Sequence, residues 1–281
     1  MSRVWLITGA SSGFGRAIAE AAVAAGDTVV GAARRTEALD DLVRGHPGQV
    51  EAVRMDVTSP EAPAVVDQVV DRHGRLDVLV NNAGRTQVGA LEETTAEELR
   101  YLFDLHFFGP AALTKAVLPH MRRQGGGAVV QMSSVGGQIT GPGFGAYCAT
   151  KFALEGLTQT LRQEVDFGVR FLIVEPGAFR TGLFNPGAAY LSEELPEYAE
   201  TVGPTRGYVT GGDGSQPGDP AKAAAAILTA LDAEQTPLRL ALGGDAVDNI
   251  RTELDTRAAE LAAWEQLSRA TAFDETAGQH P

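Results

Sequence analysis

The stretch Thr8-Gly9-Ala10-Ser11-Ser12-Gly13-Phe14-Gly15 decides the fold expected for this chain. It lies between an apolar run, Val4–Thr8, and a helical pattern over residues 14–25. Glycine lets a backbone turn tightly and approach a phosphate, and a helix start offers free N–H groups at the positive end of its dipole. A glycine-rich turn alone is also compatible with a plain tight turn. Its place after a strand and before a helix predicts a pyrophosphate-binding turn.

Short apolar runs alternate with helical patterns along the rest of the chain. We expect strands at residues 4–8, 28–33, 50–55, 76–80, 128–132, 169–174 and 238–242, and helices at 14–25, 62–73, 95–123, 144–167, 220–233 and 246–267. This alternation predicts a Rossmann-type α/β fold, a doubly wound sheet of seven parallel strands covered on both faces. Right-handed crossovers then bring the carboxyl ends of all strands to one edge, where ligands bind.

The predicted fold is one domain over residues 1–270, followed by a polar tail at 271–281. Residues 178–218 interrupt the regular alternation, because they are rich in glycine and proline with scattered aromatic residues. This segment is too long for an ordinary connection and predicts a lid.

Composition excludes several classes of protein. With 281 residues and 44% hydrophobic residues, the chain can bury a sizeable core. No apolar run approaches the roughly 18 residues of a membrane span, and no signal peptide is visible. The single cysteine, Cys148, excludes an internal disulfide and predicts a cytoplasmic protein. A net charge of −13 argues against nucleic acid or an anionic membrane as a partner. The five histidines and Cys148 show no ligand-like grouping, so no metal site is expected.

Tyr147 and Lys151 lie four residues apart on the expected helix 144–167, and therefore on one face of it. A nearby ammonium lowers the pKa of a phenol from its ordinary value of about 10, which would suit proton exchange with a carbonyl or alcohol. A surface Tyr–Lys pair is the alternative. Ser134, at the end of a strand, can hydrogen-bond a substrate oxygen, whereas Ser133 alternates to the other face.

With these motifs the chain resembles the short-chain dehydrogenase/reductase family in its classical form, nearest to the steroid and retinol dehydrogenase-like branch. The resemblance covers about residues 3–242. It is carried by the glycine turn, Asp56, Asn81-Asn82-Ala83-Gly84, Ser134, Tyr147-x-x-x-Lys151, and Pro176-Gly177 with Thr181. It implies the strand order 3-2-1-4-5-6-7. It also implies a homodimer or homotetramer, with the helices at 95–123 and 144–167 as the interface.

The resemblance also implies roles for individual residues. Tyr147 would be the general acid/base, Lys151 would lower its pKa and hold the nicotinamide ribose, and Ser134 would position the substrate oxygen. Asp56 would meet the adenine, although a cap at a strand end is the alternative. Tyr147 is also expected to contact the cofactor. The other residues expected there are Gly9, Ser11, Ser12, Gly13, Phe14, Gly15, Arg34, Val57, Asn82, Ala83, Gly84, Pro176, Gly177 and Thr181.

His106 departs from the family pattern, which has an asparagine at this place. In the family the backbone carbonyl here holds a water that leads to the lysine, and a backbone group survives the change of side chain. The imidazole titrates near neutral pH, so it can join a proton relay or simply pack. His106 is therefore a candidate catalytic residue. Arg85, directly after Gly84, can attract an acidic substrate or point to solvent.

The cofactor is predicted from the end of the strand at 28–33. Arg34 and Arg35 follow it, with no acid to bind the adenosine ribose of NAD. An arginine there pairs with the 2′-phosphate of NADP, and Ser11 and Ser12 add hydroxyl donors. Two solvated arginines are the alternative. We predict NADP(H).

The predicted function is therefore an NADP(H)-dependent oxidoreductase that interconverts a carbonyl and a secondary alcohol by hydride transfer. The apolar side chains in or near the lid favour a small hydrophobic ketone or alcohol as substrate; they are Phe144, Phe179, Leu183, Phe184, Tyr190, Tyr198 and Tyr208. A dinucleotide-binding redox sensor without catalysis, or an epimerase or dehydratase of the same family, are the alternatives.

Overall fold

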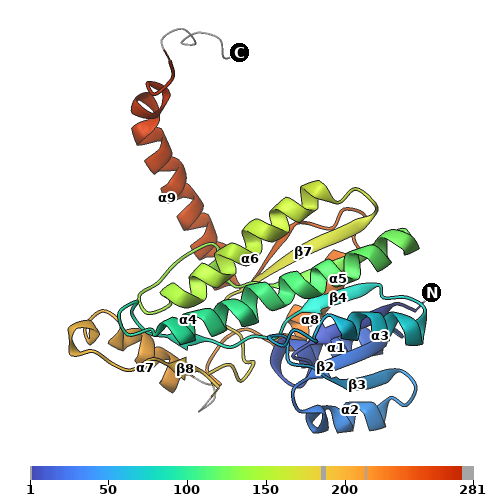
Figure 1. The fold of residues 1–281 in the computed structure, drawn as a ribbon. Coiled ribbons are helices and arrows are strands. Elements are labelled where there is room, and N and C mark those ends of the chain that lie inside the picture. The colour runs from blue at the N-terminus through green and yellow to red at the C-terminus, as the bar shows by residue number, and fades with distance from the viewer. Residues whose placement is uncertain (1, 185–187, 213, 274–281) are drawn as a thin grey trace.

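The glycine turn connects β1 (Val4–Thr8) to α1 (Gly13–Ala24), as predicted. Figure 1 shows the computed structural model, which describes residues 2–184, 188–212 and 214–273. The tail predicted at 271–281 lies outside these residues from 274 onward.

Seven parallel strands form the main sheet, in the order expected from the sequence. They are, across the sheet, β3 (Val50–Arg54), β2 (Thr28–Ala33), β1, β4 (Val78–Asn81), β6 (Gly127–Met132), β7 (Val169–Pro176) and β9 (Arg239–Leu242). The order reverses between β1 and β4, which is the place where such sheets bind ligands.

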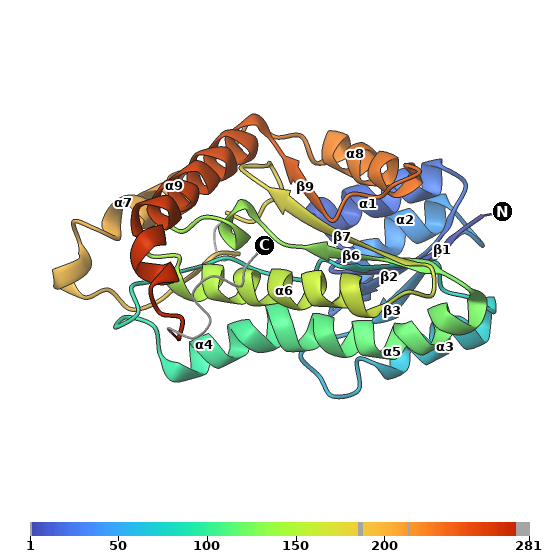
Figure 2. The same ribbon diagram turned by 90° about the horizontal axis from the view of Figure 1, so that it is seen from above.

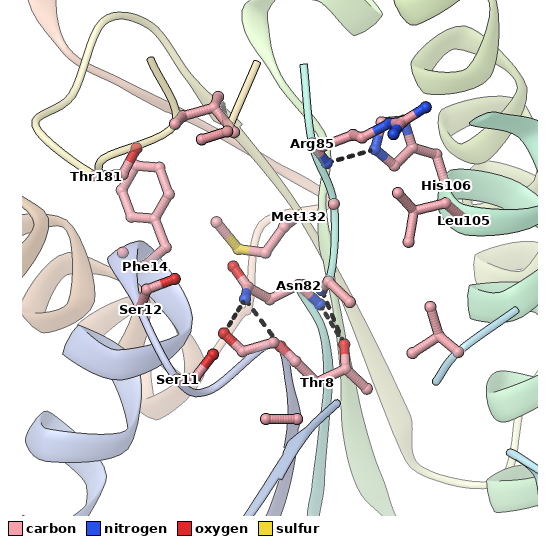
Figure 3. Close-up of a pocket in the computed structure, with 18 of the residues that line it drawn as sticks. Thr8, Ser11, Ser12, Phe14, Asn82, Arg85, Leu105, His106, Met132 and Thr181 are labelled. Carbon is pink, nitrogen blue, oxygen red and sulfur yellow. Dashed lines mark hydrogen bonds between the residues drawn. The ribbon is translucent and has the colours of Figure 1, made fainter. Parts of the chain in front are cut away.

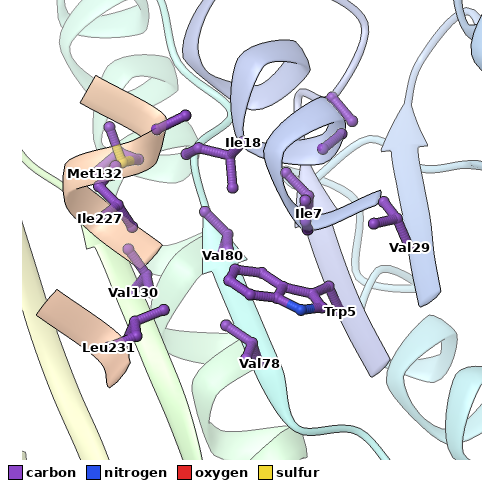
Figure 4. Packing of buried hydrophobic residues seen from close by; sticks show 14 of the residues in the cluster. Trp5, Ile7, Ile18, Val29, Val78, Val80, Val130, Met132, Ile227 and Leu231 are labelled. Carbon is purple, nitrogen blue, oxygen red and sulfur yellow. The ribbon is translucent and has the colours of Figure 1, made fainter. Parts of the chain in front are cut away.

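Helices cover both faces of the sheet (Figure 2). Trp5 and Ile7 of β1 pack with α1 and α8 (Pro220–Asp232) on one face. Val4 and Leu6 point the other way, toward α3 (Ala64–His73) and α5 (Gly109–Gln124). Figure 4 shows Trp5 inside the first of these two layers, where its indole N–H donates to Asp27 at 2.8 Å. This bond lets a large side chain with one polar atom be fully buried.

The long helix expected at 95–123 is divided in two by a π-helical turn. Thr95 caps α4 (Ala96–Phe103), and Glu98 completes a capping box. The π-helical turn Asp104–Phe108 follows, and α5 begins directly after it. Pro110 has no N–H to donate to the carbonyl of His106, so the α-helical bond at that carbonyl cannot form. The interruption therefore lies just before Pro110, whereas Pro119 lies inside α5, which continues to Gln124.

Short elements that periodicity did not predict surround the carboxyl edge of the sheet. Among the described residues, β5 (Gln87–Val88) pairs with β8 (Tyr190–Leu191), which joins the loop after β4 to the segment predicted as a lid. That segment also holds α7 (Gly203–Gly211). Strands of two residues are too short to show a periodic pattern. The helix α2 (Asp40–Gly45) was likewise not predicted.

The last two long helices differ in how they are covered. The helix α6 (Gly145–Glu164) lies beside α4 and α5 on the sheet (Figure 2). The helix α9 (Gly244–Arg269) leaves the sheet and projects from the body (Figure 1). Over the described residues, no helix is both long and apolar enough to cross a membrane.

Candidate active site

A cavity of about 610 Å³ lies at the carboxyl ends of the strands. Nearly all of the residues predicted for the site line it, although they come from widely separated parts of the chain. They are Gly9, Ser11, Ser12, Gly13, Phe14, Arg34, Asp56, Val57, Asn82, Ala83, Gly84, His106, Ser134, Tyr147, Lys151, Pro176, Gly177 and Thr181. Gly15 is the exception.

Gly15 has a packing role beside the glycine turn. A β-carbon at this position would stand 2.5 Å from Nδ2 of Asn82 and closer still to the carbonyl oxygen of Gly9. Gly15 therefore lets α1 approach the turn, rather than facing the cavity. Gly9 and Gly13 have φ angles of +64° and +55°, a region that side-chain-bearing residues rarely adopt.

Thr8 and Asn82 fix the turn to the next strand (Figure 3). The Thr8 hydroxyl accepts the N–H groups of Asn82 at 2.8 Å and Ala83 at 3.0 Å, and donates to the carbonyl of Val80. The Asn82 amide donates to the carbonyls of Thr8 at 2.8 Å and Gly9 at 3.2 Å. These bonds join the ends of β1 and β4 into one rigid frame.

The start of α1 has the features of an anion site. Ser12 is the N-cap residue, yet its side chain makes no capping hydrogen bond, and the first turn holds no acid. Arg34 and Arg35 are exposed at the end of β2, and neither has an ion-pair partner within the described residues. Free helix N–H groups with nearby unpaired guanidinium groups fit the phosphates of a dinucleotide.

Asp56 serves as a local cap and also lines the cavity. Its Oδ1 atom accepts the N–H of Thr58 at 3.0 Å and the hydroxyl of Thr58 at 2.8 Å. Both predicted interpretations of Asp56 therefore fit its position.

Ser134, Tyr147 and Lys151 meet at the cavity. The Lys151 ammonium donates to the carbonyl of Met132 at 2.8 Å and lies 5.6 Å from the centre of the Tyr147 ring. The Ser134 hydroxyl accepts the N–H of Gly136 at 3.1 Å and also lies against the Tyr147 hydroxyl, where it lowers the pKa of the phenol. The helix α6 and the end of β6 thus bring the three side chains together.

Burial dominates the protonation of the Tyr–Lys pair. The Tyr147 ring is partly exposed, but protein surrounds its hydroxyl, and this burial raises its pKa to about 12. Burial lowers the pKa of Lys151 to about 8, against the opposing charge of Glu155. The net shift of the Tyr147 pKa is upward, because desolvation of the phenolate outweighs the lowering by the Ser134 hydrogen bond. The lowering by Lys151 remains a prediction.

His106 is buried and held as a neutral ring. Its Nε2 atom accepts the N–H of Arg85 at 3.2 Å, so the proton of the neutral imidazole lies on Nδ1. Nδ1 is 3.0 Å from the hydroxyl of Thr150, which in turn donates to the carbonyl of Tyr147. Burial, followed by the charges of Lys151 and Arg85, lowers the pKa of His106 well below its ordinary value.

A buried polar cluster supports the loop that carries Ser134. Ser133 also lines the cavity, and its hydroxyl donates to Glu155 at 2.7 Å. Glu155 and Glu175 share Gln138 and Arg239 as partners. Burial and the charge of Glu155 raise the pKa of Glu175 to about 7.

A sequence profile of the short chain dehydrogenase family matches residues 3–189. The chain belongs to the short-chain dehydrogenase/reductase family.

Two relatives illustrate the similarity. The chain is 36% identical to the oxidoreductase BOA17 of Botryotinia fuckeliana, with 97% of this chain and 100% of that protein covered. It is 38% identical to a 3-ketodihydrosphingosine reductase of Bacteroides thetaiotaomicron, over 71% of this chain and 72% of the relative.

Solved structures of the family have the same fold. A short-chain dehydrogenase from Streptomyces avermitilis is 66% identical with a TM-score of 0.91, covering 96% of this chain and 98% of that chain. An alcohol dehydrogenase from Thermococcus sibiricus in complex with 5-hydroxy-NADP is 27% identical, with a TM-score of 0.71 and coverage of 86% and 96%. A family member from Burkholderia phymatum in complex with NAD is 25% identical, with a TM-score of 0.77 and coverage of 89% and 92%.

Sequence reasoning missed several residues that line the cavity of this short-chain dehydrogenase/reductase. They include Thr8, Met55, Tyr101, Leu105, Met132, Gly182 and Ala188. Thr8 could have been found, because a polar residue at the end of a buried strand needs partners. Tyr101 carries no such signal, since its place on α4 is an ordinary helical position.

Proposed function

We propose that this protein is an NADP(H)-dependent oxidoreductase that interconverts a carbonyl and a secondary alcohol. The observation that carries the proposal is that Ser134, Tyr147 and Lys151 meet in the same cavity as the glycine turn. One end of that cavity suits a dinucleotide, and the other presents a proton-exchanging phenol. When bound, the dinucleotide supplies or accepts the hydride.

Tyr147 acts as the general acid in the direction of reduction. A phenol with a pKa of about 12 is protonated at neutral pH and can donate its proton to a carbonyl oxygen. The Ser134 hydroxyl stands beside that phenol and holds the same oxygen. Lys151 places its positive charge beneath the Tyr147 ring and stabilises the phenolate that forms.

His106 holds the backbone in place and does not transfer protons itself. Both ring nitrogens already have partners, and its lowered pKa keeps the ring neutral at physiological pH. The carbonyl of His106 lacks an α-helical partner because residue 110 is proline. We assign the relay toward Lys151 to this carbonyl, as the family resemblance implies.

NADP(H) is the proposed cofactor because Arg34 and Arg35 are exposed, lack ion-pair partners in the described ranges and line the cavity. The 2′-phosphate of NADP would supply the missing negative charge. Family structures are in complex with an NADP derivative in one case and with NAD in another, so this chain's own residues carry the argument.

The proposed substrate is a hydrophobic ketone or alcohol. Leu105 and Leu183 line the cavity, and Phe144, Phe184, Ala189 and Tyr198 pack around a small core to which the segment 178–218 itself contributes Val202 and Val209. We propose that this segment acts as a lid. The 3-ketodihydrosphingosine reductase among the relatives has a name that fits a long-chain keto compound.

Fluorescence titration with NADPH and NADH, followed by a panel of ketones and aldehydes, tests the proposal. We expect tighter binding of NADPH than NADH, with the preference lost in Arg34→Ala, and turnover of at least one carbonyl. Tyr147→Phe should reduce turnover by about 10²- to 10⁴-fold without weakening NADPH binding. Tight binding with no turnover over a broad panel would favour the sensor instead.

A homodimer or homotetramer is the proposed assembly. Phe108, beside α5, is 56% exposed, and α9 exposes Leu254, Leu261, Trp264 and Leu267 as it leaves the body. Apolar side chains that gather on a projecting helix favour burial against another chain. Light scattering of the wild type and of Trp264→Glu measures the assembly, and a monomeric wild type would contradict it.

A further inference from the structure

Arg85 stands on the wall of the cavity beside the catalytic residues. Its side chain lies across the cavity from Ser11, Ser12 and Phe14 and close to His106 (Figure 3). Its backbone N–H is fixed by the bond to His106, whose ring centre is 5.6 Å from that of Tyr147. Arg85 therefore lies at the substrate end of the cavity, away from the glycine turn.

Two aromatic rings hold the guanidinium of Arg85. Its Cζ atom is 4.6 Å from the centre of the Tyr101 ring and 4.6 Å from that of Tyr190. Tyr101 comes from α4, whereas Tyr190 comes from β8 in the proposed lid. Contacts of this kind use the flat face of the guanidinium and leave the N–H groups on its edge free to donate.

The guanidinium of Arg85 makes no hydrogen bond or ion pair within the described residues, and its Nε atom is buried without an acceptor. Glu98 is near enough for the charge of Arg85 to help lower the pKa of that carboxyl, but it does not bond the guanidinium. The nearby Glu98 instead accepts the N–H of Thr95, the Tyr190 hydroxyl and the Ser192 hydroxyl, at 3.0, 2.7 and 2.9 Å. A guanidinium held in place but left without an acceptor is prepared for a ligand that brings one.

The cavity as a whole favours negative charge. Among the described residues, its walls carry Arg34, Arg35, Arg85 and Lys151 but a single acid, Asp56, in a protein of net charge −13. Arg34 and Arg35 lie at the end of β2, which the proposed NADP(H) would occupy. Arg85 is at the other end, so a dinucleotide phosphate bound at β2 leaves it unpaired.

We propose that Arg85 binds a carboxylate of the substrate, so that the substrate class is a ketone or alcohol with an apolar body and an acidic group. This inference rests on the proposed function. The carboxylate would accept N–H groups from the edge of the guanidinium, in the two-point geometry that arginine makes with planar acids. Closure of β8 over the substrate would keep Tyr190 stacked on the arginine.

A homologous series of straight-chain methyl ketones, each with a terminal carboxylate and each paired with its methyl ester, tests the proposal. We expect kcat/KM for the best acid to exceed that for its ester by about 10- to 100-fold. Arg85→Met keeps the length of the side chain and should remove this preference while leaving turnover of the esters within about threefold. The control is Arg100→Met, since Arg100 is an exposed arginine of α4 that pairs with Glu97 and does not line the cavity.

The outcomes separate this inference from the proposed function. If neither acids nor esters are reduced, the proposed function fails. If the wild type reduces esters as well as acids, or if Arg85→Met slows both alike, the arginine has no role in recognition. If Arg85→Met weakens NADPH binding as much as it weakens turnover of the acids, the guanidinium binds the cofactor and the proposal is overturned.

A second measurement uses only the wild-type protein, so it tests the proposal even if Arg85→Met does not fold. Turnover of a neutral ketone by the wild type should be inhibited competitively by straight-chain fatty-acid anions, but not by the matching alcohols, and the inhibition should weaken with added salt. Equal inhibition by alcohols and acids would contradict the proposal.

Discussion

At the glycine turn the cavity wall is made of backbone held by hydrogen bonds between adjacent strands, whereas around Arg85 it is made of side chains from distant segments. Thr8, Asn82 and Gly9 bond one another across β1 and β4. Arg85, Tyr101 and Tyr190 meet through ring contacts, and Tyr190 arrives from more than a hundred residues along the chain. The first arrangement is rigid and suits a ligand of constant shape. The second depends on how the segment 178–218 sits, and suits selection among substrates.

The substitution with the largest expected effect tests whether the two ends of the cavity, at the glycine turn and around Arg85, are independent. Arg206 of α7 forms a buried ion pair with Glu93 at 2.7 Å and donates to the carbonyl of Ser192 at 2.8 Å, thereby fixing the proposed lid. Arg206→Met leaves the Glu93 carboxylate buried without its cation and should cost about 3–5 kcal/mol of folding stability. Thermal unfolding measures the loss, and KM for ketones should rise while the NADPH dissociation constant stays within about twofold of wild type.

Arg269→Met is the control for this variant, because it removes an exposed pair with Glu265 that is worth about 0.5 kcal/mol or less. A large loss of NADPH affinity in Arg206→Met would show that the two ends of the cavity are coupled.

Gly15→Ala disturbs the rigid end directly. The added methyl would collide with the Gly9 carbonyl and stand 2.5 Å from the Asn82 amide, so the turn must shift. We expect a loss of about 1–3 kcal/mol in unfolding free energy. NADPH binding should weaken more than ketone binding. Gly156→Ala on α6 is the matched control, since a β-carbon there meets nothing within 4 Å and should not destabilise the protein. Unchanged NADPH affinity in Gly15→Ala would contradict the assignment of the glycine turn to cofactor binding.

The buried acids Glu155 and Glu175, which support the loop of Ser134, should make the stability of the protein depend on pH. The pKa of Glu175 is raised to about 7, so the folded protein holds its proton more tightly than the unfolded chain. The stability that this provides is complete below the ordinary pKa of about 4.5 and is lost as pH rises through about 7. Between pH 5 and pH 8, Tm of the wild type should therefore fall by roughly a few degrees more than that of Glu175→Gln. Glu260→Gln on α9 is exposed and should keep the wild-type slope. If Tm falls equally with pH in the wild type and in Glu175→Gln, the raised pKa of Glu175 is contradicted.

The smallest effect is expected from His106→Asn, at a residue that lies between the two ends of the cavity. An asparagine amide would occupy the place of Nδ1 beside the Thr150 hydroxyl, so His106→Asn should leave kcat within about threefold and the pH profile unchanged. His106→Leu removes the acceptor and should lower stability by about 1–3 kcal/mol. An inflection between pH 5 and 8 that disappears in His106→Asn would restore the imidazole to the proton relay.

Much of the fold was predictable because buried parallel strands are continuous apolar runs and the turns between them carry glycine and asparagine. The seven strands, their order and the carboxyl-edge cavity follow from that pattern. Pro110 marks a kink in the helix expected at 95–123, but the π-helical form of the turn Asp104–Phe108 is set by how Pro110 deprives one carbonyl of its partner. The two-stranded pair β5–β8 was missed because two residues cannot show a period.

The candidate site divides in the same way. Ser134, Tyr147 and Lys151 were predictable from spacing on one strand end and one helix face. The direction in which the pKa of Tyr147 shifts was not predictable, because it depends on how deeply the hydroxyl is buried. The protonation of His106 likewise needed its two hydrogen-bond partners, which are 21 and 44 residues away.

The sequence alone determined the family, the sheet and the residues that gather at its edge, because these depend on local periodicity and on the backbone freedom of glycine. Only the tertiary structure decided which of those residues are neutral, which are paired and which are left with an unused donor. Desolvation and hydrogen bonding are set by atoms that come together from distant parts of the chain. For that reason Arg85, for which the sequence left an acidic substrate and solvent as alternatives, becomes in the folded protein the cation that we propose to select the substrate.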